Sequence, residues 1–274
     1  MRVVRLSKLH ATGNDFLVRV GEDPDDVLDA VTVAALCDRR RGVGADGLIT
    51  IGAGGPGHDC SMLLQNADGG VAEMSGNGIR CLAWVAERRG LARGDRLTVA
   101  TGGGRRDVTL SVGEHGEVVG ASVDMGPATF GPRVDIELDG TKMVGVTVDM
   151  GNPHLVIAVD DPDAVDVARH GPAIEHDPRF PNRINVEFTR SIGRERLQMR
   201  VWERGVGETL SCGTGVCAAS AAMVRAGACD PNLSVQVPGG VLRVMVGDTI
   251  TLAGPVVHVF DLDIDRERLL ATLR

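Results

Sequence analysis

The chain repeats itself once, at about half its length. Residues 75–79 (SGNGI) resemble residues 212–216 (CGTGV), and each segment is followed by an apolar run that ends at a glycine, Gly90 or Gly227. A double glycine follows at 102–103 and again at 239–240, at the same offset, and Gly13-Asn14 matches Gly151-Asn152 one residue further apart. Four matches in the same order indicate a duplicated unit and predict two similar halves.

Local patterns support this interpretation. Residues 79–89 and 216–226 are rich in alanine and aliphatic side chains and predict helices, with Gly90 and Gly227 as left-handed C-terminal caps. Further helices are expected at 27–39 and 162–170. Alternating or continuous apolar runs predict strands; they lie at 96–100, 107–112, 118–124, 143–150, 197–202, 234–237, 242–246 and 256–263.

These elements predict an α/β (α+β) fold of two pseudo-symmetric lobes. Each lobe is expected to be a mostly antiparallel curved sheet around a central helix. We expect an N-terminal lobe at residues 1–117, joined by the C-terminal strand and helix at about 262–274, and a C-terminal lobe at 118–261. A linker is expected near 113–120.

Composition excludes several classes of function. The net charge of −8 and the absence of tyrosine disfavour nucleic acid and an anionic membrane surface as partners. Lysine occurs only at positions 8 and 142, which limits any cofactor that needs a Schiff-base lysine. The first residues do not resemble a signal peptide, and no apolar stretch suits a membrane span, so a cytoplasmic location is expected.

The six cysteines form no CxxC pair and are expected to be reduced thiols. Their spacing matches no usual zinc site, so no metal is expected. Residues 42–47 (GVGADG) satisfy the dinucleotide pattern G-x-G-x-x-G. That pattern should follow a strand and open a helix, and here it follows a helix-like stretch and precedes a strand-like one. We therefore expect no nicotinamide or flavin cofactor.

The repeated motif places a proton-carrying side chain, Ser75 or Cys212, before a Gly-x-Gly at the start of a helix. A helix N-terminus favours a carboxylate, and it is expected to lower the pKa of Cys212 towards a usable thiolate. If the two motifs face one another, one base can remove an α-proton and an acid can return it on the opposite face. The chain is thus expected to be a cofactor-independent amino-acid racemase or epimerase. In one copy, the simpler interpretation is a small core cysteine and capping glycines; two aligned copies favour a site.

Seven segments, taken together, resemble the diaminopimelate epimerase family and cover nearly the whole chain. They are residues 10–16 (HATGNDF), 41–47 (RGVGADG), 66–69 (NADG), 74–78 (MSGNG), 150–154 (MGNPH), 183–186 (RINV) and 203–215 (ERGVGETLSCGTG). The resemblance implies that LL-2,6-diaminopimelate is converted to the meso form without a cofactor, in lysine and peptidoglycan biosynthesis. It also implies a homodimer.

The resemblance further implies a role for each matching residue. Cys212 corresponds to the second catalytic cysteine, and His154 and Glu203 would lie near the reacting centre and orient its ammonium group. Backbone N–H groups would bind the reacting carboxylate, and further side chains would hold mainly the distal end of the substrate. The backbone N–H groups are those of Gly76, Asn77, Gly213 and Thr214. The side chains for the distal end are those of Asn14, Asn66, Asn152, Asn185 and Arg204. Taken singly, each asparagine could equally be a turn residue, and His154 could be structural.

One position departs from the family. Ser75 stands where the first catalytic cysteine is expected, and a hydroxyl is a much weaker acid than a thiol. Three interpretations are open: a natural variant with a working Ser/Cys pair, an engineered substitution, or a chain that has lost turnover. We favour the first. Gly47 also stands where some members of the family carry glutamine.

Two alternatives to the epimerase remain open from the sequence. One keeps the fold and changes the substrate, giving another amino-acid racemase or an isomerase of the phenazine-biosynthesis type. The asparagine and arginine residues suited to a second amino-acid end argue against it. The other is an amino-acid-binding protein with impaired turnover, which is suggested only by Ser75.

Overall fold

The structure, a computed structural model, describes residues 3–21 and 27–271. Its chain divides into two compact units, residues 1–123 with 254–274 and residues 124–253, and each is described here by itself. The chain passes from the first unit to the second at Val123–Asp124 and returns at Ala253–Gly254. Residues 272–274 of the predicted C-terminal segment, like residues 1–2, lie outside the described residues.

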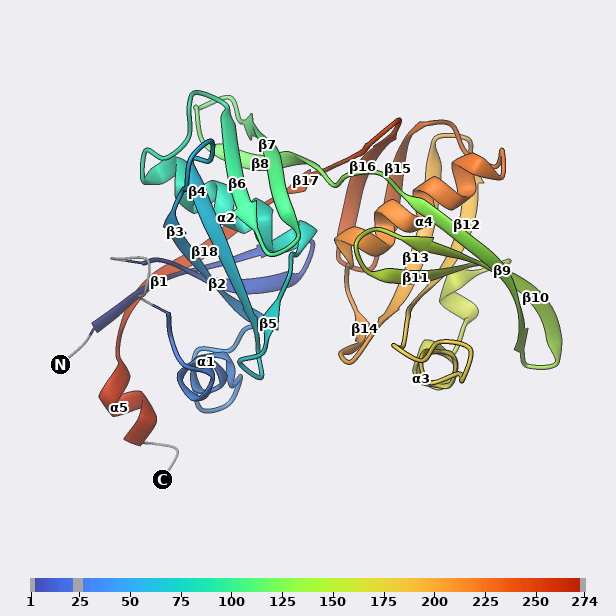
Figure 1. The fold of residues 1–274 in the computed structure, drawn as a ribbon, viewed down its shortest axis with the longest axis horizontal. Coiled ribbons are helices and arrows are strands. Elements are labelled where there is room, and N and C mark those ends of the chain that lie inside the picture. Colours follow the sequence, from blue (N-terminus) through green and yellow to red (C-terminus); the bar gives the residue numbers. More distant parts are fainter. Residues whose placement is uncertain (1–2, 22–26, 272–274) are drawn as a thin grey trace. The chain divides into compact units, whose positions relative to one another are not determined.

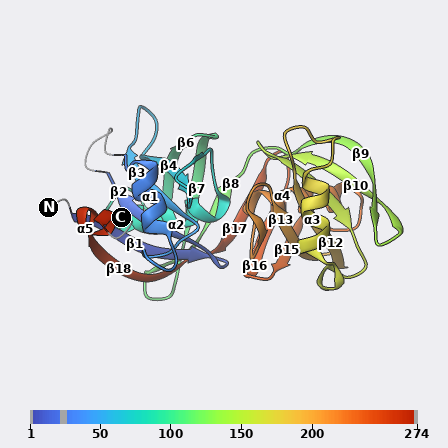
Figure 2. The ribbon, with the colours of Figure 1, turned by 90° about the horizontal axis from the view of Figure 1, so that it is seen from below.

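The first unit is a mostly antiparallel sheet with one enclosed helix (Figure 1). Strand β2 pairs in parallel with β3, as β4 does with β6, and the other pairings in this unit are antiparallel. Its strands are β1 (Val3–Ala11), β2 (Asn14–Val20), β3 (Gly47–Ala53), β4 (Cys60–Asn66), β5 (Val71–Ala72), β6 (Arg96–Thr101), β7 (Gly104–Val112), β8 (Val118–Asp124) and β18 (Val257–Asp265). Its helices are α1 (Ala30–Cys37), α2 (Gly76–Arg88) and α5 (Arg266–Ala271), and Figure 2 shows α5 beside α1.

The second unit repeats this pattern strand by strand. Here β11 pairs in parallel with β12, as β13 does with β15, and the remaining pairings are antiparallel. Its strands are β9 (Thr129–Leu138), β10 (Thr141–Asp149), β11 (Pro153–Ala158), β12 (Asn185–Gly193), β13 (Arg196–Glu203), β14 (Gly207–Thr209), β15 (Asn232–Val237), β16 (Gly240–Val246) and β17 (Ile250–Pro255). Its helices are the 3₁₀ turn η1 (Pro162–Ala164), α3 (Val167–Glu175) and α4 (Gly213–Arg225).

The central helices are buried because each packs inside its own sheet. Helix α2 contacts β1, β2, β3 and β4, and α4 contacts β10, β11, β12 and β13. In α2 the side chains from Ile79 to Ala83 are fully buried, and so are those from Val216 to Ala219 in α4. The two helices have equal length and end alike, with Gly90 and Gly227 at φ +70° and +74°. The sequence-predicted fold of two lobes, each with a mostly antiparallel sheet around a central helix, is confirmed.

The unit boundaries differ from those predicted, which were 117/118 and 261/262. Strand β8 pairs with β7 from Val112↔Val118 to Val108↔Val123, so residues 118–123 belong to the first unit. Strand β18 pairs with β1 over its whole length, which places residues 254–261 there too. The expected linker near 113–120 is wrong. Gly113 donates its N–H to the carbonyl of Glu117 (2.7 Å), so Gly113 and Gly116 form the β7–β8 turn, and Gly120 lies within β8.

The helix expected at 162–170 is split and runs further. Asp161 caps the 3₁₀ turn and Asp166 caps α3, while Val165 between them is extended, with ψ at 129°. Two carboxylates that each accept a backbone N–H thus begin two separate elements. None of the helices in the described part of the chain combines the length and apolar character that a membrane span needs.

Candidate active site

Cys212 is the N-terminal cap of helix α4. Its backbone is extended, at φ −117° and ψ 115°, and its Sγ accepts the N–H of Gly215 at 3.4 Å. The side chain is buried, and Thr214 Oγ1 lies 3.5 Å from the sulfur. A thiol in the cap position is thereby held beside the first N–H groups of the helix, including those of Gly213 and Thr214, which have no partner within the helix.

The Cys212 thiol is strongly protonated, contrary to the expectation from the helix N-terminus. Burial raises its pKa well above the ordinary value, and the nearby carboxyl groups of Glu203 and Glu187 raise it further. The hydrogen bonds from Thr214 and Gly215 act in the opposite direction and are weaker. The loss of hydration outweighs these hydrogen bonds, so the resting side chain is a thiol that carries its proton.

A chain of hydrogen bonds leads from Cys212 to a buried ion-pairing side chain. Asn152 Nδ2 donates to Thr214 Oγ1 (3.3 Å), and Asn152 Oδ1 lies 2.9 Å from His154 Nε2. His154 Nδ1 lies 2.6 Å from Glu187 Oε1. Both side chains of this last pair are fully buried. The structure thus brings together Cys212, Thr214, Asn152 and His154 in one unit.

Glu203 and Arg204 form a turn beside this chain. The amide of Asn185 holds the turn, because its Oδ1 accepts the N–H of Arg204 (2.8 Å) and its Nδ2 donates to the carbonyl of Pro153 (2.9 Å). Burial raises the pKa of Glu203, although hydrogen bonds with Thr209 and Cys212 partly oppose the shift. Arg204 is exposed, and its Nη1 donates to the carbonyl of Asn182 at 3.2 Å.

Ser75 occupies the same cap position in the first unit. Its Oγ accepts the N–H of Gly78 at 3.0 Å, with the backbone at φ −136° and ψ 124°. The following residues Gly76 and Asn77 are buried, and Asn77 Nδ2 donates to Asn14 Oδ1 (3.2 Å). By the repeat, this pair matches Asn152 and Thr214, so the same two positions are bonded in both units, but the donor is Asn77 on the helix here and Asn152 before β11 there.

Asn14 is held in turn by a charged network. Its Nδ2 donates to Asp46 Oδ2 (2.7 Å), and Arg39 bridges Asp46 and Asp15 at 2.7 and 2.6 Å. Lys8 is buried and forms an ion pair with Asp15. The hairpin that carries Asn14 is thereby tied to the loop between α1 and β3.

This network predicts a dependence of stability on pH. Burial by itself raises the pKa of Asp15, but hydrogen bonds from Arg39 and Lys8 outweigh it and hold that pKa at about 2, below the ordinary 3.8. A lowered acid pKa stabilises the fold above the ordinary value, and this stability is lost as the pH falls from about 4 to about 2. We expect about 2 kcal/mol of the free energy of unfolding to disappear over that range. Urea unfolding at each pH measures it.

The matched variants are Asp15→Asn and Glu114→Gln. Asp15→Asn should be less stable than the wild type at pH 7 and should show a flatter pH dependence between pH 4 and 2. Glu114 is exposed, so its substitution should leave the pH dependence of the wild type intact. Parallel curves for Asp15→Asn and the wild type would contradict the assignment.

Asn66 lies at the end of β4, with an exposed side chain. Its N–H donates to the carbonyl of Gly70 (2.8 Å) and its carbonyl accepts from Gly69 (2.8 Å), which closes the turn into β5. Residues 42–46 lie between α1 and β3, and Gly47 begins β3, so a helix precedes the motif and a strand follows, the reverse of the dinucleotide-binding order. Among the described residues there is no group of three or more His, Cys, Asp or Glu side chains that could hold a metal ion.

Glu187 was not predicted from the sequence. This carboxylate lies between Val186 and Phe188 on β12, and all three side chains are fully buried. A charged residue inside an apolar strand was the available signal, because such a group stays buried only with a partner. Arg80, fully buried on α2, was also missed; it donates to the carbonyl of Gly76 (3.0 Å) and to Asn77 Oδ1 (2.8 Å).

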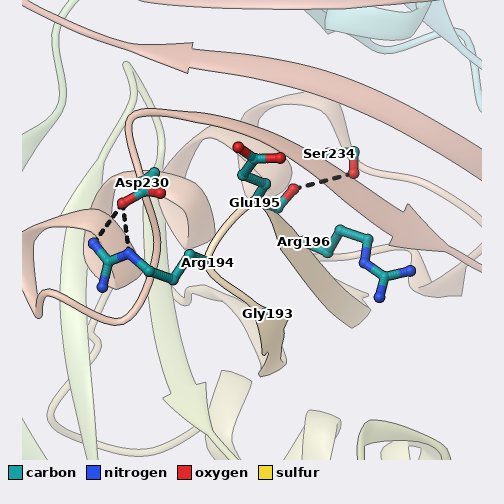
Figure 3. Close-up of a pocket in the computed structure, with 6 residues that line it drawn as sticks. All are labelled: Gly193, Arg194, Glu195, Arg196, Asp230 and Ser234. Atoms are coloured by element: carbon teal, nitrogen blue, oxygen red, sulfur yellow. Dashed lines mark hydrogen bonds and ion pairs between the residues drawn. The ribbon is translucent and has the colours of Figure 1, made fainter.

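A surface pocket of about 450 Å³ lies at the other end of the second unit's strands (Figure 3). Arg194 points to Asp230 there, with Nε 2.7 Å from the carboxylate, and Ser234 donates to the carbonyl of Glu195. Gly193 ends β12 whereas Asn185 begins it, so the pocket is remote from the Cys212 contacts.

The comparison with known sequences identifies the family. The sequence profile of the diaminopimelate epimerase family matches residues 6–131 and 146–259. This chain belongs to the diaminopimelate epimerase family. A diaminopimelate epimerase of Synechococcus elongatus is 41% identical over 276 residues, covering 94% of this chain and 96% of that protein. One of Moorella thermoacetica is 40% identical, covering 92% and 96%. The resemblance to diaminopimelate epimerases found in the sequence is confirmed.

Solved structures share the fold of this family member at low identity. A Bacillus anthracis phenazine biosynthesis protein of the PhzF family has a TM-score of 0.73 at 17% identity, covering 97% of this chain and all of that one. A hydroxyproline epimerase of Agrobacterium vitis, solved with trans-4-hydroxy-L-proline bound, has a TM-score of 0.73 at 15% identity, covering 96% and 92%. Identities this low support the fold alone.

Proposed function

We propose that this protein epimerises 2,6-diaminopimelate, interconverting the LL and meso forms at one α-carbon without a cofactor. The single observation that carries the proposal is the proton-bearing Cys212 in the cap position of α4, within a chain that belongs to the diaminopimelate epimerase family. Lysine and peptidoglycan biosynthesis are the pathways that use this product.

The chemistry needs two proton-carrying groups. One removes the α-proton as a base, the electron pair of the C–H bond moves into the adjoining carboxylate, and the other group donates a proton to the opposite face of the carbon. We assign these roles to Cys212 and Ser75. The backbone N–H groups of Gly76, Asn77, Gly213 and Thr214, at the start of the two helices, would stabilise the negative charge that develops on the carboxylate.

The remaining predicted residues would bind the amino and carboxyl groups of the substrate. His154 and Glu203 lie near Cys212 in the second unit and are suited to orient the reacting ammonium group. Further side chains would hold mainly the distal amino-acid end, because amides both donate and accept and a guanidinium pairs with a carboxylate; these are Asn14, Asn66, Asn152, Asn185 and Arg204.

Solvent exchange tests the proposal directly. In D₂O, the protein should incorporate deuterium at the α-carbon of LL-diaminopimelate and of the meso form, which proton NMR follows as the α-proton signal is lost. Lysine, which lacks the distal carboxyl group, should not exchange. No exchange into either isomer at high protein concentration would contradict the proposed function.

Arg204→Ala should weaken substrate binding more than it slows the chemical step. The exposed guanidinium is expected to pair with the distal carboxylate in the ground state and the transition state alike, so its loss raises KM with little change in kcat. We expect KM to rise by about 10- to 100-fold, the loss of one charge-assisted contact. Steady-state kinetics measure both constants, with the exposed Arg190→Ala as the control. A fall in kcat at unchanged KM would contradict the role.

We also propose a homodimer and a cytoplasmic location. The dimer is favoured by exposed apolar side chains along β18, namely Val257, Val259 and Phe260. Sedimentation of the full chain should give about twice the chain mass of 28.8 kDa.

The cytoplasmic location is favoured by the six cysteines, which are all free and buried and therefore suit a reducing compartment.

A further inference from the structure

The two units differ beneath their matching cap residues. Phe16 of the first unit corresponds to His154 of the second, because Phe16 pairs with Gly47 just as His154 pairs with Asn185. In the same way Ile49 corresponds to Glu187, because Ile49 pairs with Val18 and Glu187 with Val156. The Ser75 motif therefore lies over an apolar pair, whereas the Cys212 motif lies over a histidine and a carboxylate.

The helix starts contact these buried residues directly. A Cβ added at Gly78 would lie 3.0 Å from Ile49 Cδ1, and one added at Gly215 would lie 2.6 Å from Glu187 Oε1. The carboxyl of Glu187 thus lies against the first turn of α4, where the cap residue Cys212 is held. Its second oxygen, Oε2, is buried and has no hydrogen-bond partner in the described structure. A carboxylate in this setting needs a nearby positive charge or a proton.

The geometry places a proton between Glu187 and His154. Asn152 Nδ2 donates to Thr214, so Asn152 Oδ1 faces His154 Nε2, which must then carry a hydrogen to make the 2.9 Å contact. His154 Nδ1 and Glu187 Oε1, 2.6 Å apart, would repel unless a proton lies between them. That proton belongs to an imidazolium or to a carboxylic acid, and the pair is electrically neutral in either case.

This arrangement defines the donor and the acceptor of each hydrogen bond between His154 and Cys212. His154 donates to Asn152, and Asn152 donates to Thr214. The Thr214 oxygen has accepted a hydrogen and is free to donate its own to the Cys212 sulfur, 3.5 Å away. Hydrogen bonds that end on sulfur favour the thiolate, and they oppose the burial that raises the pKa of this cysteine. The carboxyl of Glu187 also raises that pKa through its charge, and the proton shared with His154 reduces this effect because the pair is neutral.

We propose that Glu187 is a positioning residue of the epimerase reaction, which shares a proton with His154 and so directs the Asn152–Thr214 hydrogen bonds onto Cys212. The proposal rests on the proposed function. Since the first unit has Phe16 and Ile49 at the matching positions, Glu187 acts on one of the two proton-carrying groups. Its loss should impair the deprotonation of one stereoisomer and spare that of the other.

The test compares the two isomers in one variant. Glu187→Gln keeps the shape of the side chain and cannot share a proton in the same way. Initial rates of deuterium exchange are measured separately from LL- and meso-diaminopimelate, and we expect one rate to fall at least 10-fold further than the other. Glu175→Gln is the matched control, because Glu175 is also a buried carboxyl of this unit but bonds Trp202 Nε1 and the N–H of Gly205. The control should leave the ratio of the two rates unchanged.

A spectroscopic readout accompanies the kinetics. Nitrogen-15 NMR should show a different His154 Nδ1 signal in the wild type, where this nitrogen shares a proton with Glu187, and in Glu187→Gln, where no such proton is left. If that variant does not fold, Thr214→Val carries the same isomer test, since it removes the last hydroxyl of the chain and keeps the side-chain shape.

The outcomes separate the two proposals. A wild type that exchanges neither isomer contradicts the proposed function. A wild type that exchanges both isomers, with a variant whose rate ratio is unchanged or whose His154 spectrum equals that of the wild type, overturns the role of Glu187 alone.

Discussion

Cys212→Ala is expected to abolish epimerisation, with both the overall rate and the α-proton exchange falling by about 10³-fold. The thiol is the proton-carrying group at the cap of α4, and alanine can neither accept nor donate a proton. A water molecule would not replace it well, because the position is buried. Proton NMR of diaminopimelate in D₂O measures exchange, and a chiral separation of the isomers measures turnover.

Cys229→Ala is the matched control for this variant. Cys229 is another buried thiol of the second unit, but it lies 3.7 Å from Ser191 Oγ at the opposite end of β12. Its loss should leave the rate of exchange near that of the wild type. If Cys212→Ala kept most of the exchange of both isomers, the assignment of Cys212 as an acid and base would be wrong.

Ser75→Cys is expected to increase the rate of epimerisation by about 10²-fold. A thiol has a reference pKa of about 8.5, far closer to neutrality than an aliphatic hydroxyl, so it serves better as a general base. The substitution preserves the cap, because a cysteine already caps α4. There the Cys212 sulfur accepts the N–H of Gly215, just as the Ser75 oxygen accepts the N–H of Gly78. The variant therefore changes the acidity of the group while its position is kept.

Exchange from the two isomers gives this variant a second measurement. With two unlike bases, the wild type should exchange one isomer faster, and Ser75→Cys should narrow the difference. Ser111→Cys, at an exposed position, controls for the mere addition of a thiol. An unchanged or lower rate in Ser75→Cys would show that Ser75 is not the limiting base of this chain.

The repeat made much of the fold predictable. Cap serine, Gly-x-Gly, apolar run and terminal glycine are local signals, and helix α2 follows from them to within three residues at its start. Strands β1, β2 and β12 were harder, because they carry buried polar residues among their apolar ones and their alternation is incomplete. The glycines near residue 116 were misread for a related reason: a turn and a linker use the same residue types.

The sequence by itself determined the family, the duplicated units and the two cap residues Ser75 and Cys212, since all of these depend on residues that are neighbours in the chain. The tertiary structure alone decided the state of those residues. The pKa of Cys212 is raised because the fold removes water and brings Glu203 and Glu187 near it, against the hydrogen bonds from Thr214 and Gly215. Glu187 meets His154 across a parallel strand pair, 33 residues away in the chain, and desolvation and strand register of this kind have no local sequence signature.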